Sequence, residues 1–199
     1  MTIHPMRTLP LLLGVSVLAL TGCAQWGPQA PEKDKTYAIT ILHTNDHHGR
    51  FWKNRDGEYG MAARKTVIDQ IRQEVQAAGG YSLLLDGGDV NTGVPESDLQ
   101  DAVPDFRGMN LLGYDAMAVG NHEFDKPPVV LQMQRDLATF PMLSANIYKD
   151  GQRMFSPYKV FNLGGVRVGV MGLTTEDTQK MVHPDNIRGV TFADTQTET

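Results

Sequence analysis

The chain has 199 residues, of which 41% are hydrophobic, and its formal net charge is −5. This length suits one globular domain with its own core and is short for two. The acidic balance argues against a nucleic-acid-binding surface, which is usually basic, so we expect no nucleic acid among its partners. A single cysteine, Cys23, excludes an intrachain disulfide.

The first 23 residues have the pattern of a secretory signal. Arg7 gives a positive start, and Leu9 to Leu20 form an apolar run that is short for a transmembrane helix. The next residues, Leu20-Thr21-Gly22-Cys23, resemble the lipobox of bacterial lipoproteins, in which the cysteine carries palmitate or other acyl chains. The alternative is an ordinary cleaved signal with a chance cysteine. We expect residues 1–23 to be a lipoprotein signal peptide and the lipid on Cys23 to anchor the protein in the cell envelope. Because Ala24 and not Asp follows the cysteine, the resemblance favours the outer membrane.

Residues 24–36 are rich in Pro, Gln, Gly and Lys and predict a flexible tether to a domain over residues 37–199. The β-branched run 37–42 predicts a buried strand, and the polar residues 43–49 predict a loop. Residues 61–78 show helical periodicity, with one apolar face made of Ala62, Val67, Ile68, Ile71 and Val75. The pair Gly79-Gly80 is expected to end this helix.

Short apolar runs then alternate with polar or helical segments. Strands are predicted at 82–85, 116–119 and 142–144, with a loop over the site at 90–104, and short helices at 105–112 and 129–138. Residues 158–161 and 166–171 predict a hairpin joined through Gly164-Gly165, and residues 177–199 predict no element. This alternation predicts an α/β fold with parallel pairing, in which ligands bind beyond the carboxyl ends of the strands.

Three polar clusters follow three of these strands. Asp46 and His48 are two residues apart in an extended loop, so a carboxylate and an imidazole can converge on one ion, although Asp-x-His alone is more often two solvated residues. Asp89 follows a glycine pair after a strongly apolar strand, where a carboxylate could bridge two cations or simply cap a turn. Asp86 sits one step too early to be the ligand, and His47 points opposite to its neighbours.

The third cluster is Gly120-Asn121-His122-Glu123. The amide oxygen of Asn121 can serve as a neutral metal ligand, and His122 can contact a phosphate or donate a proton. Asp125, three residues on, can fix the imidazole tautomer of His122 and favour the imidazolium, or it can cap the helix that Pro127 opens.

Together the three clusters form the signature of calcineurin-like two-metal phosphoesterases, an α/β/β/α sandwich. The runs 42–49, 87–93 and 114–125 resemble the bacterial 5′-nucleotidase family. The run Val94 to Asp101 resembles its UDP-sugar hydrolase subgroup, and the lipobox resembles the membrane lipoprotein 5′-nucleotidases of vibrios.

The resemblance implies roles for individual residues. Asp46 and His48 would bind one metal, Asp89 would bridge, Asn121 would bind the second metal, and His122 with Asp125 would stabilise the transition state. It implies a monomeric, metal-dependent phosphoric monoester hydrolase that converts extracytoplasmic nucleotides, with UDP-sugars as further substrates, to nucleoside and phosphate. The cofactors would be two divalent cations among Zn, Mn, Co and Mg, and a need for chloride stays open. A cyclic-nucleotide phosphodiesterase and a non-catalytic surface lipoprotein are the alternatives.

The resemblance also implies residues that this sequence does not contain. Family members carry a later Gly-His-x-His-like motif and a C-terminal nucleotide-binding domain, whereas His183 stands alone before Pro184. We therefore expect the sequence to be the incomplete N-terminal part of such an enzyme. On its own we expect it to bind metal weakly and to turn over little.

Overall fold

The computed structural model describes residues 30–58 and 60–199. The expected signal peptide, its Cys23 and residues 24–29 of the expected tether lie outside the described residues. Within the described part of the chain, no helix is both long enough and apolar enough to cross a bilayer.

A four-stranded parallel sheet with the order β1-β2-β3-β4 forms the centre of the fold. Its register places Ile39 opposite Tyr81 and Met117 opposite Met142. Because all four strands run in the same direction, their carboxyl ends meet at one edge of the sheet. The predicted α/β fold with parallel pairing is confirmed. The strands are β1 (Ile39–Thr44), β2 (Tyr81–Asp86), β3 (Ala116–Ala118) and β4 (Met142–Leu143).

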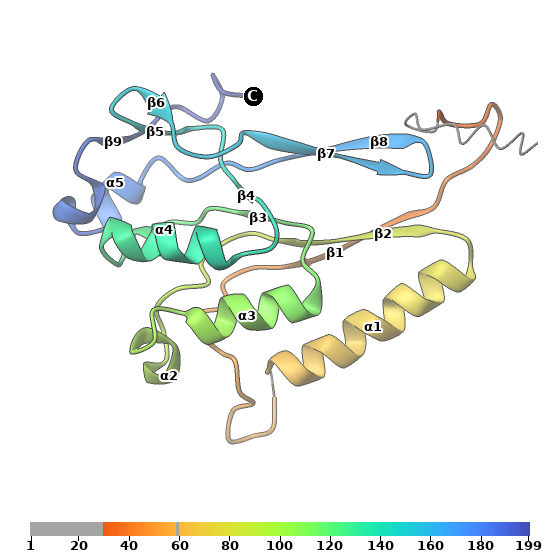
Figure 1. The fold of residues 1–199 in the computed structure, drawn as a ribbon, viewed down its shortest axis with the longest axis horizontal. Helices are drawn as coiled ribbons and strands as arrows, with labels where there is room; N and C mark the ends of the chain where they lie inside the picture. The colour runs from red at the N-terminus through yellow and green to blue at the C-terminus, as the bar shows by residue number, and fades with distance from the viewer. Residues whose placement is uncertain (1–29, 59) are drawn as a thin grey trace, which may run out of the picture.

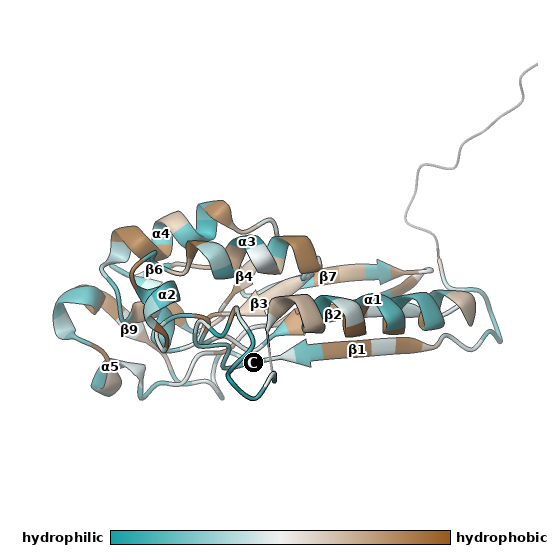
Figure 2. Cartoon of the chain, turned by 90° about the horizontal axis from the view of Figure 1, so that it is seen from below, coloured by the Kyte–Doolittle hydropathy of each residue, from teal (hydrophilic) through white to brown (hydrophobic). Residues whose placement is uncertain are grey.

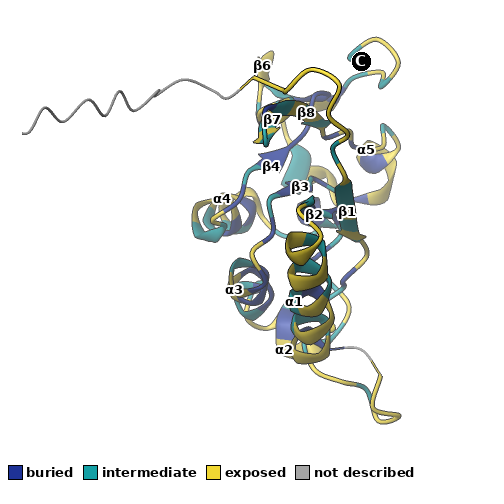
Figure 3. Ribbon diagram, turned by 90° about the vertical axis from the view of Figure 1, so that its right-hand side faces the viewer, coloured by how far each residue is buried: buried dark blue, intermediate teal, exposed yellow. Residues whose placement is uncertain are grey.

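Three helices cover one face of this sheet, as Figure 1 shows: α1 (Met61–Ala77), α3 (Val103–Leu112) and α4 (Pro128–Leu137). The core lies between them and the sheet, where Phe106, Met109 and Met117 are at most 1% exposed. In Figure 3 the outer side of α1 is exposed while β4 is buried. Burial of this apolar layer, at about 25 cal/mol per Å² of apolar surface, is the main force that holds helices and sheet together.

The remaining strands lie on the side of the parallel sheet away from α1, α3 and α4 (Figure 1). β7 and β8 form the antiparallel hairpin that the sequence predicts, and Gly164 and Gly165 in its turn have φ angles of 63° and 100°, which suit glycine. The further strands are β5 (Ile147–Lys149), β6 (Gln152–Arg153), β7 (Tyr158–Leu163), β8 (Val166–Met171) and β9 (Val190–Phe192).

Four short helical segments complete the described chain. They are α2 (Pro95–Asp98), α5 (Thr178–Met181), and the 3-10 turns η1 (His122–Phe124) and η2 (Pro184–Ile187). The predicted loop at 90–104 was therefore wrong in part, because it contains α2 and the start of α3. The prediction of no element over 177–199 was also wrong, since α5, η2 and β9 lie there.

Two further details differ from the sequence prediction. β1 extends to Thr44, so His43 and Thr44 are not loop residues; they pair in register with Leu85 and Asp86 of β2. Figure 2 shows β1 as apolar along its length with a polar arrowhead, which leads into the site. The buried side of α1 includes Met61 and Ile68, whereas Val67 is 55% exposed and Ala62 is also exposed. Gly79, with φ 72°, ends α1 as predicted.

Candidate metal centre

The three polar clusters lie together at the carboxyl edge of the parallel sheet. The loop after β1 runs beside the loop after β2, and backbone hydrogen bonds join them: Asp46 N donates to Gly88 O (3.0 Å) and His48 N donates to Asp89 O (3.1 Å). The loop after β3 joins through His122 N, which donates to Asp89 Oδ1 (2.9 Å). Parallel pairing thus places residues that are more than 70 positions apart in sequence within contact of one another.

The carboxylate of Glu123 ties the second and third loops together. It is fully buried, and its two oxygens accept hydrogen bonds from four backbone amides: Asp89 N (2.9 Å), Val90 N (2.9 Å), Asn91 N (3.3 Å) and Gly120 N (2.7 Å). Burial raises the pKa of Glu123 to about 7, although the amide of Asp89 opposes the shift. Sequence reasoning gave Glu123 no role. The available signal was a glutamate four residues after a predicted buried strand, where a buried carboxylate must find donors.

The backbone of these loops is left-handed at four residues that are not glycine. They are Asp46 (φ 52°), His48 (φ 49°), Asp89 (φ 60°) and Thr92 (φ 54°). Asp and His tolerate this region better than most residues, whereas a β-branched residue such as Thr is an outlier there. Such strain gathers at functional sites, where the surrounding structure holds it in place.

The side chains of His48, Asp89 and His122 form a candidate cation site, with ligand atoms that all lie within 4.8 Å of one another. Nδ1 of His48 lies 2.7 Å from the carbonyl oxygen of Thr92. Because a carbonyl oxygen only accepts, Nδ1 carries the hydrogen and Nε2 keeps its lone pair for a cation. Asp46 Oδ1 lies 3.6 Å from that Nε2. Imidazole nitrogens and carboxylate oxygens together are a donor set that fits divalent metals such as zinc.

His122 and Asp125 form the dyad that the sequence spacing suggests. Nδ1 of His122 lies 2.6 Å from Asp125 Oδ2, and the hydroxyl of Thr92 donates to the same oxygen at 2.6 Å. Burial lowers the pKa of His122, but the hydrogen bond and charge of Asp125, helped by Asp89 and Glu123, outweigh it and raise the pKa overall. The rings of His48 and His122 meet edge to face, with centroids 4.7 Å apart.

The remaining site residue, Asn121, precedes η1 and its carbonyl accepts from Phe124 N (3.0 Å). Among the described residues, its side-chain amide has no hydrogen-bond partner. The metal role of Asn121 therefore stays a prediction. The sequence predicts that His122 contacts phosphate. The structure also places a ring nitrogen of His122 within 4.8 Å of ligand atoms of His48 and Asp89, close enough for the three side chains to hold one cation.

Two neighbours of the site are structural. Asp86 is buried, accepts from Thr44 Oγ1 and Gly88 N, and burial raises its pKa. His47 turns away from Asp46 and His48, and its Nε2 lies 2.9 Å from Asp105 Oδ1 in α3, with both side chains at most 1% exposed. Ser97 of α2 donates to the other oxygen of Asp105 (2.6 Å). Part of the run 94–101 thus helps to hold the loop after β1 in place.

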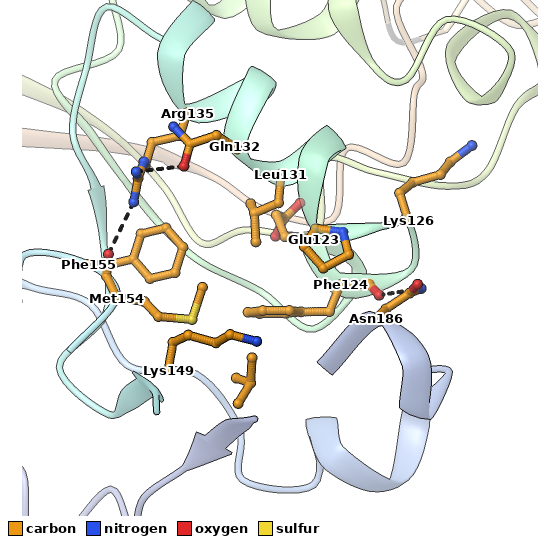
Figure 4. A pocket seen from close by; sticks show the side chains of 12 residues that line it. Glu123, Phe124, Lys126, Leu131, Gln132, Arg135, Lys149, Met154, Phe155 and Asn186 are labelled. Atoms are coloured by element: carbon orange, nitrogen blue, oxygen red, sulfur yellow. Dashed lines mark hydrogen bonds between the residues drawn. The ribbon is translucent and has the colours of Figure 1, made fainter. Parts of the chain in front are cut away.

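A cavity of about 150 Å³ lies next to the site and shares Glu123 with it. Its walls combine apolar and polar side chains. Figure 4 shows Phe124, Leu131 and Met154 around it, with Arg135 hydrogen-bonded to Gln132 and to the carbonyl of Met154. None of the residues in the candidate cation site lines this cavity. The chemistry therefore belongs to the open edge of the sheet.

The sequence and the fold are similar to those of known phosphoesterases and 5′-nucleotidases. Residues 39–199 match the family described as calcineurin-like phosphoesterase. The chain is 60% identical over 190 residues to a 5′-nucleotidase of Vibrio cholerae, which covers 94% of this chain and 34% of that protein. It is 64% identical over 169 residues to protein UshA of Yersinia enterocolitica, covering 84% and 31%. The crystal structure of a 5′-nucleotidase precursor from Thermus thermophilus superposes with a TM-score of 0.69 at 35% identity, covering 80% of this chain and 32% of that one. The chain thus spans about a third of the length of the curated relatives it matches.

Proposed function

The chain belongs to the calcineurin-like phosphoesterase family, and on that premise we propose that it forms the metal-binding part of an extracytoplasmic 5′-nucleotidase. Its high identity to curated 5′-nucleotidases supports this reaction class. The observation that carries the proposal is the convergence of His48, Asp89 and His122 at one edge of the sheet, with Asp125 behind His122. The substrates would be nucleoside 5′-monophosphates, with UDP-sugars as a second class.

Each residue has a task in this proposal. Asp46, His48, Asp89 and Asn121 would hold two divalent cations, drawn from Zn, Mn, Co and Mg. When bound, such cations supply Lewis acidity and positive charge to a phosphate ester. Asp125 accepts from the N–H at Nδ1 of His122, so the second proton of the imidazolium would lie on Nε2, the nitrogen that would contact the ester. An imidazolium held in this way would donate a hydrogen bond to the phosphoryl group or a proton to the leaving oxygen.

Replacing His122 with Ala in the protein that carries this chain tests the proposal. Loss of the proton donor should lower kcat for 5′-AMP by roughly 10²- to 10⁴-fold. Metal content, measured by atomic emission, separates loss of chemistry from loss of the cations. Parallel assays with UDP-glucose and a cyclic nucleotide define the substrate class. A wild-type protein that binds metal but hydrolyses none of these esters would leave a non-catalytic surface lipoprotein as the better interpretation.

We also propose that a lipid on Cys23 anchors the protein in the outer membrane. The apolar run Leu9 to Leu20 and the lipobox-like residues 20–23 support this, and both precede the described residues. Replacing Cys23 with Ser should move the protein from the membrane fraction to the soluble fraction of the cell envelope. Unchanged fractionation with membranes would refute the lipid anchor.

A further inference from the structure

Thr92 contacts both the histidine expected to bind metal and the catalytic dyad. Its carbonyl oxygen lies 2.7 Å from Nδ1 of His48. Its hydroxyl donates to Asp125 Oδ2 at 2.6 Å and lies 3.0 Å from Nδ1 of His122. Thr92, in the loop after β2, therefore contacts both the loop after β1 and the loop after β3.

The backbone conformation of residue 92 is one that threonine adopts only with strain, so the presence of threonine there suggests a role for its side chain. Thr92 has φ 54°, a conformation that glycine or asparagine adopts far more easily than a β-branched residue. The next residue, Gly93, packs so closely that an added Cβ would lie 2.4 Å from the carbonyl oxygen of His48. A glycine at position 92 would relieve the backbone strain, so the side chain of Thr92 is expected to provide something that a glycine would lose.

What the side chain provides is a second donor to Asp125. Nδ1 of His122 and the hydroxyl of Thr92 both contact Oδ2 of this carboxylate. The hydroxyl therefore restricts rotation of the carboxylate and keeps Oδ2 directed at the imidazole. Asp125 alone, with its side chain about a quarter exposed, would be free to turn toward solvent.

We propose that Thr92 is a positioning residue for the reaction, which holds Asp125 in line with His122 through its hydroxyl while its carbonyl sets the tautomer of His48. This inference rests on the proposed nucleotidase function. It gives Thr92, which like Asp89 has a positive φ angle in the run 87–93, a task that differs from those of the metal ligands and of the His122–Asp125 pair.

Three variants of the protein that carries this chain separate the hydroxyl from the backbone. Thr92→Val keeps the β-branched shape and the strain but loses the hydroxyl, and kcat should fall by roughly 10- to 100-fold while KM and Mn²⁺ affinity change little. Thr92→Ser restores the hydroxyl and should stay close to wild type. Thr92→Gly removes both strain and hydroxyl, so its thermal midpoint should rise while kcat falls as in Thr92→Val.

Two further variants control the experiment. Thr191→Val alters an exposed threonine in β9 and should leave kcat and thermal midpoint unchanged. His122→Ala tests the proposed function itself, so an inactive His122→Ala beside a fully active Thr92→Val would overturn the positioning role and leave the nucleotidase assignment intact. A Thr92→Ser variant as slow as Thr92→Val would also overturn it, because packing of the methyl group would then explain the loss. Loss of metal affinity in Thr92→Val in step with kcat would do the same.

Discussion

Gly120 allows two of the loops that form the site to pack closely against each other. A Cβ added at this position would lie 2.2 Å from Asp89 Oδ1 and 2.6 Å from Asp89 N. No positive φ angle is involved at Gly120, so the consequence of Gly120→Ala is steric. The new methyl group would compete for space with the carboxylate that we expect to bridge two cations.

The size of the effect follows from the distances. Ordinary contact with a Cβ begins at 3.4 Å, so Oδ1 of Asp89 must move by about 1.2 Å from its present 2.2 Å. Metal-ligand distances tolerate about 0.2 Å, and a misplacement of about 1 Å lowers turnover roughly 10²-fold. The shift also strains the hydrogen bond from His122 N to Asp89 Oδ1. We expect overpacking to lower stability by about 1–3 kcal/mol.

The assay measures Mn²⁺ binding by calorimetry, hydrolysis of 5′-AMP and the thermal midpoint in the protein that carries this chain. Gly169→Ala is the matched control, because nothing lies within 4 Å of a Cβ built at Gly169 in β8. We expect Gly120→Ala to lose metal affinity and turnover and the control to keep both. Wild-type affinity and turnover in Gly120→Ala would refute the steric argument and the central place given to Asp89.

Two further predictions concern buried carboxyl groups. Asp105→Asn should lower the free energy of unfolding in urea by about 1–3 kcal/mol, because the buried hydrogen bonds that join Asp105 to His47 and Ser97 lose their carboxylate. Exposed Asp177→Asn should change it by less than about 1 kcal/mol; equal losses would contradict the pairing. In metal-free protein, Glu123 has a folded-state pKa of about 7 against 4.5 for an ordinary glutamate, so its contribution to stability is present below pH 4.5 and is lost as pH rises through about 7. Relative to Glu123→Gln, the wild type should therefore lose about 3 kcal/mol over this interval, and a difference that stays constant with pH would refute the shift.

The parts of the fold that the sequence predicts well are those with strong local patterns. The apolar run before Asp89 is a local signal for a strand, and the pair Pro127-Pro128 is a local signal for the start of a helix. In addition, the carboxyl ends of parallel strands must lie at the same edge of a sheet. That rule alone predicts that Asp46, His48 and Asp89 lie close together.

The parts that were missed depend on tertiary contacts. β6 is two exposed polar residues, Gln152 and Arg153, that pair with β5, and β9 is a three-residue strand whose Phe192 pairs with Ile147. Such segments have too few residues for any periodicity to appear. Glu123 was missed for a similar reason, since its partners are backbone amides that no side-chain pattern reveals.

The arrangement around Glu123 has a consequence for how the site meets an anion. Successive amides that point to one spot form a nest, which in many proteins receives a phosphate. Here the amides of residues 89–91 and 120 already hold a carboxylate that belongs to the protein itself. A free sulfate or phosphate therefore finds this nest filled, so an anion at the site would have to be held by other groups, such as the imidazoles of His48 and His122.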